Sequence, residues 1–247
     1  MYNPYSLEGK TVLVTGSSTG IGRATAIECS RLGAKLILVA RNETRLQGVL
    51  NELEGEGHQY FKCDLSSLDS VINLVDKLPV LDGVVLNAGV SKLSPIGFIK
   101  EEDFRSTFSI NTFSPILTLQ SLSKKHKLQK GSSVVFTSSI AGLGVAAVGE
   151  SSYMASKGAI CAFVKGAALE LSRKRVRVNT VCPGMIQTGL IDSYGLDKKK
   201  SSVLSNYPLG CFGRPQDVAF AIIYLLSNAS SWVTGTNLII DGGLTIK

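Results

Sequence analysis

The sequence contains few residues that could bind a metal or build a disulfide framework. Its 247 residues include only two histidines, His58 and His126, and five cysteines, which are odd in number and widely separated. A zinc site needs several Cys or His ligands at close spacing, and a disulfide-stapled domain needs paired cysteines in a short chain. We therefore expect no bound metal, and thiols that are reduced and mostly buried.

Long hydrophobic runs are also missing. No stretch reaches the roughly 18 consecutive apolar residues of a membrane span, although 44% of the residues are hydrophobic. The N-terminus has neither the basic nor the apolar region of a secretory signal peptide. The chain is long enough to bury a core without disulfides or metals. We expect one cytoplasmic domain that covers residues 1–247 and does not bind a membrane.

The net charge is +7, and many lysines and arginines fall into three groups, at 124–130, 173–177 and 198–200. Solvated surface is the simplest interpretation of these groups. A docking surface for an anionic substrate carrier is the alternative. Binding of nucleic acid is disfavoured, because no aromatic residues are interleaved with the charges.

A glycine-rich turn follows the first predicted strand. The apolar run 11–14 predicts a buried strand and residues 24–32 predict a helix, with glycines spaced G-x-x-x-G-x-G between them. Gly16 permits a tight turn, Gly20 lets a ligand approach the backbone, and Gly22 lets the helix pack closely on the strand. The unpaired N–H groups that begin the helix then predict a site for the pyrophosphate of a dinucleotide.

The second predicted strand, 35–40, is followed by Arg41. In dinucleotide-binding folds an acidic residue at the end of this strand binds the ribose 2′-hydroxyl of NAD. Arg41 would instead pair with the 2′-phosphate of NADP, helped by the hydroxyls of Ser17 and Ser18. An exposed arginine at the start of the next helix is the alternative. We favour NADP(H) over NAD(H) as the cofactor.

Strand and helix patterns alternate along the rest of the chain. Further strands are predicted at 59–63, 83–86, 132–137, 176–182 and 237–243. This alternation predicts a Rossmann-type, doubly wound α/β domain, in which helices cover both faces of a seven-stranded parallel sheet and ligands bind at the carboxyl ends of the strands. The poorly periodic stretch 188–207 is expected to form a substrate lid.

Tyr153 and Lys157 are four residues apart near the start of a predicted helix. This spacing places the phenol and the ammonium group on one helix face. A neighbouring cation stabilises a phenolate and lowers the pKa of a tyrosine from about 10. The pair could therefore transfer a proton near neutral pH, although a Tyr and a Lys at this spacing also occur by chance in many helices.

Pro115 lies inside a helix predicted for residues 102–125. Because proline has no N–H group, the carbonyl of Asn111 loses its usual helical donor. That carbonyl and the amide side chain could together hold a water molecule. A simple kink is the alternative interpretation.

Several motifs, taken together and in this order, resemble those of the short-chain dehydrogenase/reductase family of single-domain Rossmann enzymes. They are residues 15–22, Asn87-Ala88-Gly89, Asn111, Ser139, Tyr153, Lys157 and Pro183-Gly184. The resemblance implies a catalytic tetrad of Asn111, Ser139, Tyr153 and Lys157. In such a tetrad the serine polarises the substrate carbonyl, the tyrosine donates its proton, the lysine lowers the tyrosine pKa and binds the nicotinamide ribose, and the asparagine holds a water.

Ser138 is the neighbour that could be confused with Ser139, since alternation along a strand lets one of the two face the site; the family motif favours Ser139. The resemblance also implies that Asp64 meets the adenine ring and that Ile186 and Thr188 meet the nicotinamide carboxamide. The expected cofactor-binding set is Gly16, Ser17, Ser18, Thr19, Gly20, Ile21, Arg41, Asp64, Leu65, Asn87, Ala88, Gly89, Tyr153, Lys157, Pro183, Gly184, Ile186 and Thr188. Members of the family commonly assemble as tetramers, and we expect a homotetramer.

Within the family, the length of the chain and Arg41 are most similar to bacterial 3-oxoacyl-[acyl-carrier-protein] reductases. This likeness implies an NADPH-dependent carbonyl reductase, with an acidic acyl carrier protein as a partner of the basic groups at 124–130 and 173–175. Glu150 differs from the glutamine often found there in those enzymes, and its charge would disfavour an anionic substrate. The alternatives are an NAD(P)-dependent dehydrogenase of a sugar or secondary alcohol, and a nucleotide-sensing protein without catalysis.

Overall fold

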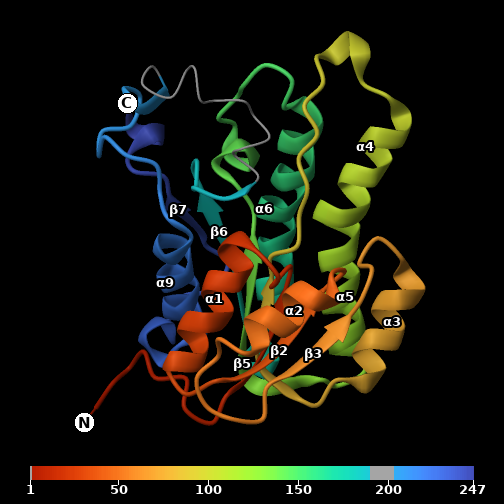
Figure 1. The fold of residues 1–247 in the computed structure, drawn as a ribbon, viewed down its shortest axis with the longest axis vertical. Coiled ribbons are helices and arrows are strands. Elements are labelled where there is room, and N and C mark those ends of the chain that lie inside the picture. Colours follow the sequence, from red (N-terminus) through yellow and green to blue (C-terminus); the bar gives the residue numbers. More distant parts are fainter. Residues whose placement is uncertain (1, 190–202) are drawn as a thin grey trace.

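The structure is a computed structural model that describes residues 2–189 and 203–247. Its centre is a sheet of seven parallel strands in the order β3-β2-β1-β4-β5-β6-β7 (Figure 1). The strands are β1 (Thr11–Thr15), β2 (Lys35–Ala40), β3 (Gln59–Lys62), β4 (Leu81–Leu86), β5 (Leu128–Thr137), β6 (Arg177–Pro183) and β7 (Asn237–Ile240). The prediction of a Rossmann-type sheet with seven strands is confirmed.

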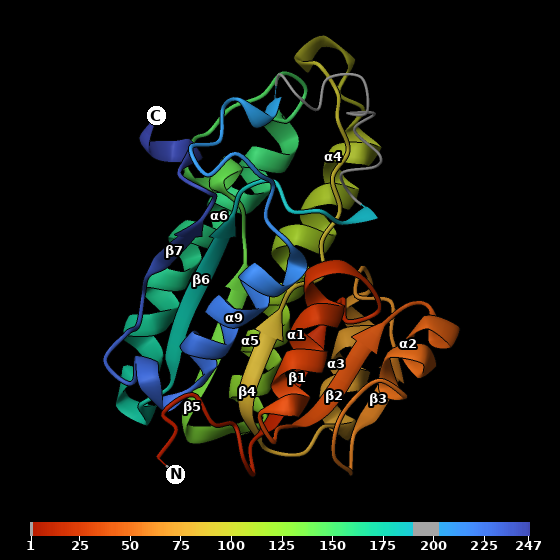
Figure 2. The ribbon, with the colours of Figure 1, turned by 60° about the vertical axis from the view of Figure 1, so that its left-hand side comes forward.

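Successive side chains of each strand pack on opposite faces of this sheet. Val12 and Val14 belong to a core with α1 (Gly20–Arg31), α2 (Glu43–Leu50) and α9 (Pro215–Leu226), whereas Leu13 belongs to a core with helices of the other face. These other helices are α3 (Leu68–Lys77), α5 (Ser114–Lys124) and α6 (Ser151–Leu171). Figure 2 shows the two helical layers on either side of the strands. Because both faces are covered, the strands carry uninterrupted apolar runs.

The helix expected over residues 102–125 is divided into three segments. α4 (Glu101–Phe108) continues into a π-helical stretch, Ser109–Phe113, which leads into α5. Pro115 lies in the first turn of α5, where the missing N–H group of a proline is tolerated. The irregularity that the sequence indicates at Asn111 is therefore a π-helical turn, a feature that often marks a functional site.

Some expected boundaries differ from the observed ones. β5 begins at Leu128 rather than at 132, because Leu128 already pairs with Leu81 before the register shifts. β7 ends at Ile240, since Gly242 and Gly243 take φ values of 62° and 87° that an extended strand does not allow. The expected lid at 188–207 lies largely outside the described residues. Within the described part of the chain, no helix combines the length and apolarity needed to cross a membrane.

Candidate active site

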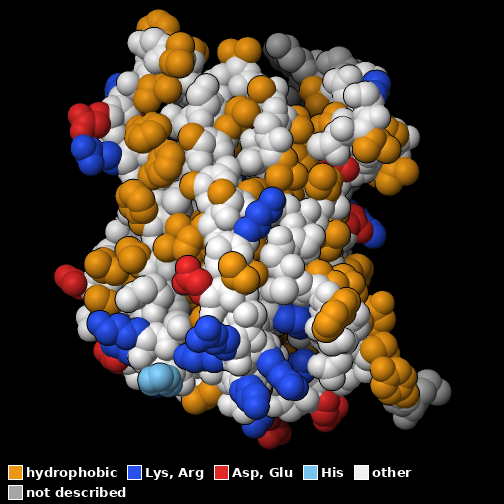
Figure 3. All heavy atoms as spheres, turned by 180° about the vertical axis from the view of Figure 1, so that it is seen from behind, with side chains coloured by type: hydrophobic (Ala, Val, Ile, Leu, Met, Phe, Trp, Pro, Cys, Tyr) orange, Lys and Arg blue, Asp and Glu red, His pale blue; other side chains and the backbone are white. Residues whose placement is uncertain are grey.

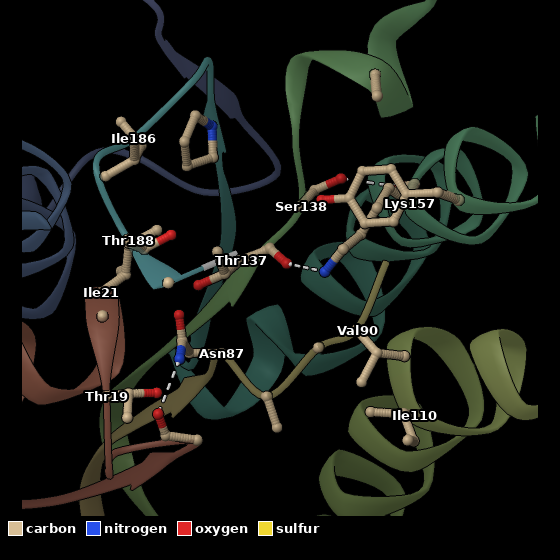
Figure 4. A pocket seen from close by; sticks show the side chains of 18 of the residues that line it. Thr19, Ile21, Asn87, Val90, Ile110, Thr137, Ser138, Lys157, Ile186 and Thr188 are labelled. Atoms are coloured by element: carbon tan, nitrogen blue, oxygen red, sulfur yellow. Dashed lines mark hydrogen bonds between the residues drawn. The ribbon is translucent and has the colours of Figure 1, made fainter. Parts of the chain in front are cut away.

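A cleft of about 1160 Å³ lies at the carboxyl ends of the strands, with walls from the loops that follow β1, β2, β4, β5 and β6 and from the start of α6. Figure 4 shows residues of the glycine-rich turn, of β5 and of the loop after β6 facing this space. Most of the expected site residues line it, namely Gly16, Ser18, Thr19, Gly20, Ile21, Arg41, Asp64, Leu65, Asn87, Ala88, Gly89, Tyr153, Lys157, Pro183, Gly184, Ile186 and Thr188. Residues far apart in the sequence thus converge as the motifs predict.

The glycine-rich turn presents an uncapped helix N-terminus to the cleft. Gly16 and Gly20 have φ values of 66° and 54°, a region that glycine enters without steric cost. Thr19, at the N-cap of α1, makes no side-chain hydrogen bond to the first N–H groups of the helix. These groups and the positive end of the helix dipole favour an anion, so the turn fits the pyrophosphate of a dinucleotide.

Ser17 differs from its expected position. Its side chain is fully buried, and its hydroxyl accepts a hydrogen bond from the backbone N–H of Val39 at 3.0 Å. Ser17 does not line the cleft. Its hydroxyl ties the glycine-rich turn to β2 and is therefore not brought to a nucleotide phosphate, whereas Ser18 does line the cleft.

Two arginines lie where the end of β2 meets the cleft. Arg41 was expected there, and Arg45 on the first turn of α2 lines the same space. The side chain of Asn42 accepts a hydrogen bond from the N–H of Arg45 at 2.9 Å, which caps α2 and fixes this turn. Sequence reasoning missed Arg45. Asn42, three residues before it, is a typical N-cap residue and could have indicated that Arg45 lies in the first turn of a helix that begins beside the cleft.

Asp64 and Asn87 hold the walls of the nucleotide side in place. Asp64 accepts hydrogen bonds from the N–H and hydroxyl of Ser66 at 3.0 and 2.8 Å, which lower the pKa of its carboxyl group. The side-chain amide of Asn87 donates to the carbonyl of Thr15 at 3.2 Å and to that of Gly16 at 3.4 Å. Asn87 thereby joins the end of β4 to the glycine-rich turn, close to the expected adenosine.

Tyr153 and Lys157 share one face of α6, as their spacing predicts. The ammonium nitrogen of Lys157 lies 5.9 Å from the centroid of the Tyr153 ring, within the range of a cation–π interaction. It also donates a hydrogen bond to the carbonyl of Thr137 at 2.8 Å (Figure 4). Burial destabilises the charged ammonium and lowers the pKa of Lys157 to about 8. The cation thus stands beside the phenol in a site of low polarity.

The side chain of Asn111 is buried, and both its oxygen and its nitrogen are hydrogen-bonded within the protein. Its oxygen accepts from the N–H of Val90 at 2.8 Å, and its nitrogen donates to the Val90 carbonyl at 2.8 Å and to the Ser156 hydroxyl at 3.1 Å. Asn111 does not line the cleft. The group available for the expected water is therefore its backbone carbonyl at the π-helical turn. A Cβ atom on Gly89 would lie 3.3 Å from both Asn111 Oδ1 and Lys157 Nζ, so Asn111 lies next to the lysine.

The two serines after β5 have different surroundings. Ser138 is buried, and its hydroxyl donates to the backbone carbonyl of Lys157 at 2.9 Å. Ser139 is partly exposed, and its hydroxyl oxygen accepts from the N–H of Ala141 at 3.2 Å. Ser138 contributes to the cleft wall and Ser139 does not. The hydroxyl hydrogen of Ser138 is donated to the Lys157 carbonyl, whereas that of Ser139 has no acceptor among the described residues.

The remaining part of the cleft is mainly apolar. Most of these residues belong to no motif, so sequence reasoning missed them; they lie in loops and short helical segments and are Val90, Ile110, Ile140, Val145, Ala146, Ala147, Met185 and Leu244. Tyr207, at the end of the stretch expected to form a lid, also lines this part. Glu150 also lines this part, and burial raises the pKa of its carboxyl group. The lining suits a substrate that carries an apolar chain beside its reactive group.

Comparison with known proteins agrees with this geometry. The model of the family described as enoyl-(acyl carrier protein) reductase matches residues 16–245. A short-chain type dehydrogenase/reductase from Mycobacterium marinum is 31% identical, superposes with a TM-score of 0.91, and the match covers 99% of this chain and 98% of that one. The chain belongs to the short-chain dehydrogenase/reductase family.

Two further members of the short-chain dehydrogenase/reductase family are informative. The 3-oxoacyl-[acyl-carrier-protein] reductase of Rickettsia prowazekii is 32% identical over 238 residues, which cover 96% of this chain and 98% of the relative. A crystal structure from Beutenbergia cavernae, described as an NAD(P)-dependent gluconate 5-dehydrogenase with NADP bound at low occupancy, is 25% identical with a TM-score of 0.91 and covers 99% of this chain and 100% of that one. Membership of the short-chain dehydrogenase/reductase family makes this chain an oxidoreductase.

Proposed function

We propose that the protein is an NADPH-dependent carbonyl reductase that acts on 3-oxoacyl thioesters. The observation that carries this proposal is the common cleft in which the Tyr153–Lys157 pair faces the uncapped N-terminus of α1. The first element can donate a proton and the second can bind a dinucleotide, and ketone reduction requires both.

The residues of the chain would divide the work as follows. When bound, the nicotinamide cofactor supplies the hydride. Ser139 does not line the cleft, so its hydroxyl would have to turn towards the ketone oxygen to donate a hydrogen bond to it. Tyr153 gives its phenolic proton to that oxygen as negative charge develops. The buried ammonium of Lys157 stabilises the resulting phenolate. The backbone carbonyl of Asn111 holds the water through which the proton is replaced.

The preference for NADP(H) rests on Arg41 and Arg45, which both line the cleft at the end of β2. Asp64 is the acidic residue of this region, but its carboxylate is already hydrogen-bonded to Ser66. Two guanidinium groups at this place favour a 2′-phosphate over a free ribose hydroxyl. The Beutenbergia cavernae structure, which holds NADP, agrees with this choice.

The Arg41→Ala variant should bind NADPH about ten- to a hundredfold more weakly than the wild type, because it loses a charge-assisted pair worth roughly 1.5–3 kcal/mol. Its affinity for NADH should stay within about twofold. Fluorescence titration with both nucleotides measures the two constants. Arg45→Ala should show the same selective loss to a smaller extent. Arg105→Ala, on α4 and paired with Glu101, is the matched control and should change neither affinity. Equal affinity of the wild type for NADH and NADPH would overturn the assignment.

The substrate proposal rests on the relatives, the apolar half of the cleft and a basic surface. The Rickettsia prowazekii relative is named as a 3-oxoacyl-[acyl-carrier-protein] reductase. A hollow of about 270 Å³ between the end of α5 and the end of α6 is lined by Ser123, His126, Leu128, Lys130, Arg173 and Lys174. Figure 3 shows lysine and arginine side chains gathered at the lower end of one face of the molecule. Such a surface suits an acidic carrier protein. It lies at the amino end of β5, opposite the cleft, so a carrier docked here would deliver its substrate to the cleft of a neighbouring subunit.

The double variant Lys130→Glu/Arg173→Glu should raise the KM for an acetoacetyl group on an acyl carrier protein about tenfold or more, since two attractive charges become repulsive. Its KM for acetoacetyl-pantetheine, which has no protein to dock, should not change. The matched control is Lys62→Glu/Arg105→Glu, which reverses two exposed charges on other elements. Raising the salt concentration should reduce the difference. Equal effects on both substrates would exclude this surface as the docking site.

A dehydrogenase of a sugar or a secondary alcohol is the second candidate. The Beutenbergia cavernae neighbour, described as a gluconate 5-dehydrogenase, supports a sugar acid within this class, whereas the carboxyl group of Glu150 in the cleft would repel one. A polyhydroxylated substrate would leave most of the apolar lining unused, so we prefer the thioester. Turnover of sugar acids without turnover of acetoacetyl thioesters would reverse this preference. Tight binding of NADPH without turnover of any ketone would instead favour a nucleotide sensor.

We also propose a homotetramer in the cytoplasm. Apolar side chains exposed on the helices and near the last strand support assembly. They are Phe113, Leu169, Trp232 and Ile239, with exposures of 56, 78, 98 and 44%. The five free cysteines are compatible with a reducing compartment.

A further inference from the structure

Two buried thiols lie in contact behind the wall of the cleft. Cys161 is on α6 and Cys182 is near the end of β6, and their sulfur atoms are 3.8 Å apart. They come from segments 21 residues apart that meet because α6 packs on β6. The other three cysteines, Cys29, Cys63 and Cys211, have no such thiol neighbour among the described residues.

This pair touches the catalytic elements without belonging to them. Cys161 lies four residues after Lys157 on α6, and its sulfur is 3.2 Å from the hydroxyl of Ser138. Ser138 in turn donates to the carbonyl of Lys157. Cys182 directly precedes Pro183 and Gly184, which line the cleft. A change in the distance between the two sulfurs would therefore act on both the helix that holds the lysine and the loop that faces the nucleotide.

We infer that Cys161 and Cys182 form an oxidisable dithiol, and that their conversion to a disulfide by hydrogen peroxide switches the proposed reductase activity off. The activity part of this inference rests on the proposed function, whereas the formation of the disulfide does not. The two sulfurs would have to approach from 3.8 Å to a bonding distance of about 2.05 Å.

The surroundings assign different roles to the two thiols. Hydrogen bonding from Cys182 and the charge of Lys157 lower the pKa of Cys161. The thiolate of Cys161 and burial raise the pKa of Cys182. Cys161 is thus the nucleophile and Cys182 the resolving thiol.

The reaction balances with peroxide as the only oxidant. The Cys161 thiolate attacks one oxygen of hydrogen peroxide, the O–O bond breaks, and a sulfenic acid and hydroxide form. Cys182 then loses its proton and attacks the sulfenic sulfur, so that the S–S bond forms and a second hydroxide leaves. With the protons of the two thiols, the products are one disulfide and two waters. A thiol reductant reverses the change.

Formation of the disulfide is expected to distort the wall of the cleft. Both sulfurs are held by packed elements, since Cys161 is 5% exposed and Cys182 is fully buried. Shortening their separation by nearly half changes the side-chain conformation of at least one of the two cysteines, next to Ser138. Because protein interiors are closely packed and leave little free space for such a change, we expect Pro183 and Gly184 to shift relative to Lys157. We expect loss of activity by more than tenfold and weaker binding of NADPH.

Peptide mapping by mass spectrometry after treatment with hydrogen peroxide tests this inference on the wild-type protein. We expect a cross-linked pair of peptides that contains Cys161 and Cys182 and is lighter by two hydrogens, together with weaker NADPH binding and more than tenfold slower ketone reduction. Dithiothreitol should restore both. The Cys161→Ala and Cys182→Ala variants should keep their NADPH binding under the same treatment, while Cys211→Ser, at an exposed thiol, and Cys29→Ala, at a buried thiol elsewhere, should remain as sensitive as the wild type.

Three results would overturn the inference: no cross-linked peptide in the wild type, a cross-link that leaves NADPH binding and activity unchanged, or equal peroxide sensitivity of the Cys161→Ala variant. If either alanine variant fails to fold, the wild-type cross-link and its reversal still decide. If no ketone is reduced at all, the proposed function fails, but the mass spectrum and the NADPH titration still report on the thiols.

Discussion

The Tyr153→Phe variant is expected to reduce acetoacetyl thioesters about a thousandfold more slowly than the wild type, with an NADPH affinity unchanged within about twofold. The substitution removes one hydroxyl group from the face of α6 that also holds Lys157, and no other described acid of the cleft is placed beside that ammonium. Steady-state kinetics give the rate, and fluorescence titration gives the affinity.

Tyr207→Phe is the matched control, because Tyr207 lines the same cleft but its hydroxyl only accepts the N–H of Met185 at 3.2 Å. Its rate should fall less than tenfold. Since the pKa of Lys157 is about 8, the ammonium loses its proton as the pH rises through that value, and wild-type reduction should decline above it. The residual rate of Tyr153→Phe should not follow this profile. A Tyr153→Phe variant with a tenth or more of the wild-type rate would contradict the assigned proton donor.

The Gly22→Ala variant is expected to lose about 3 kcal/mol of unfolding free energy and to bind NADPH at least tenfold more weakly. A Cβ atom at this position would lie 2.3 Å from the backbone oxygen of Gly16 and 2.6 Å from the side-chain nitrogen of Asn87. The first contact is with backbone that cannot turn aside, so α1 and the glycine-rich turn must separate. Urea denaturation and nucleotide titration measure the two effects.

Gly48→Ala provides the comparison, because it makes the same substitution in a helix of the same face and no atom lies within 4 Å of the added carbon. Removing a helical glycine should stabilise the protein by up to about 1 kcal/mol. Similar stabilities of the two variants would show that the turn accepts a side chain at Gly22, against the role assigned to that glycine.

The strands were predictable because burial on both faces leaves a continuous apolar run such as 35–40, which needs no knowledge of its neighbours. The Tyr153–Lys157 pair was predictable for a similar reason, since a helical turn relates the two residues locally. Both features are encoded in short stretches of chain.

Other features depend on contacts between distant segments. The hydroxyl of Ser17 turned towards Val39 instead of the cleft, and the side chain of Asn111 was taken up by Val90 and Ser156. The contact between Cys161 and Cys182 arises because α6 crosses β6. A sequence motif identifies the residues at a site, but it does not show which of their polar atoms are already hydrogen-bonded within the protein.

The nucleotide half and the apolar half of the site belong to one continuous cleft, in which Tyr153 and Lys157 stand at the junction. If the nicotinamide occupies the first half, it becomes a wall of the space left for the ketone. The ketone then has no complete binding place until the nucleotide has arrived, and the alcohol must depart before the nucleotide does. We therefore expect an ordered addition, in which NADP⁺ competes with NADPH and not with the ketone.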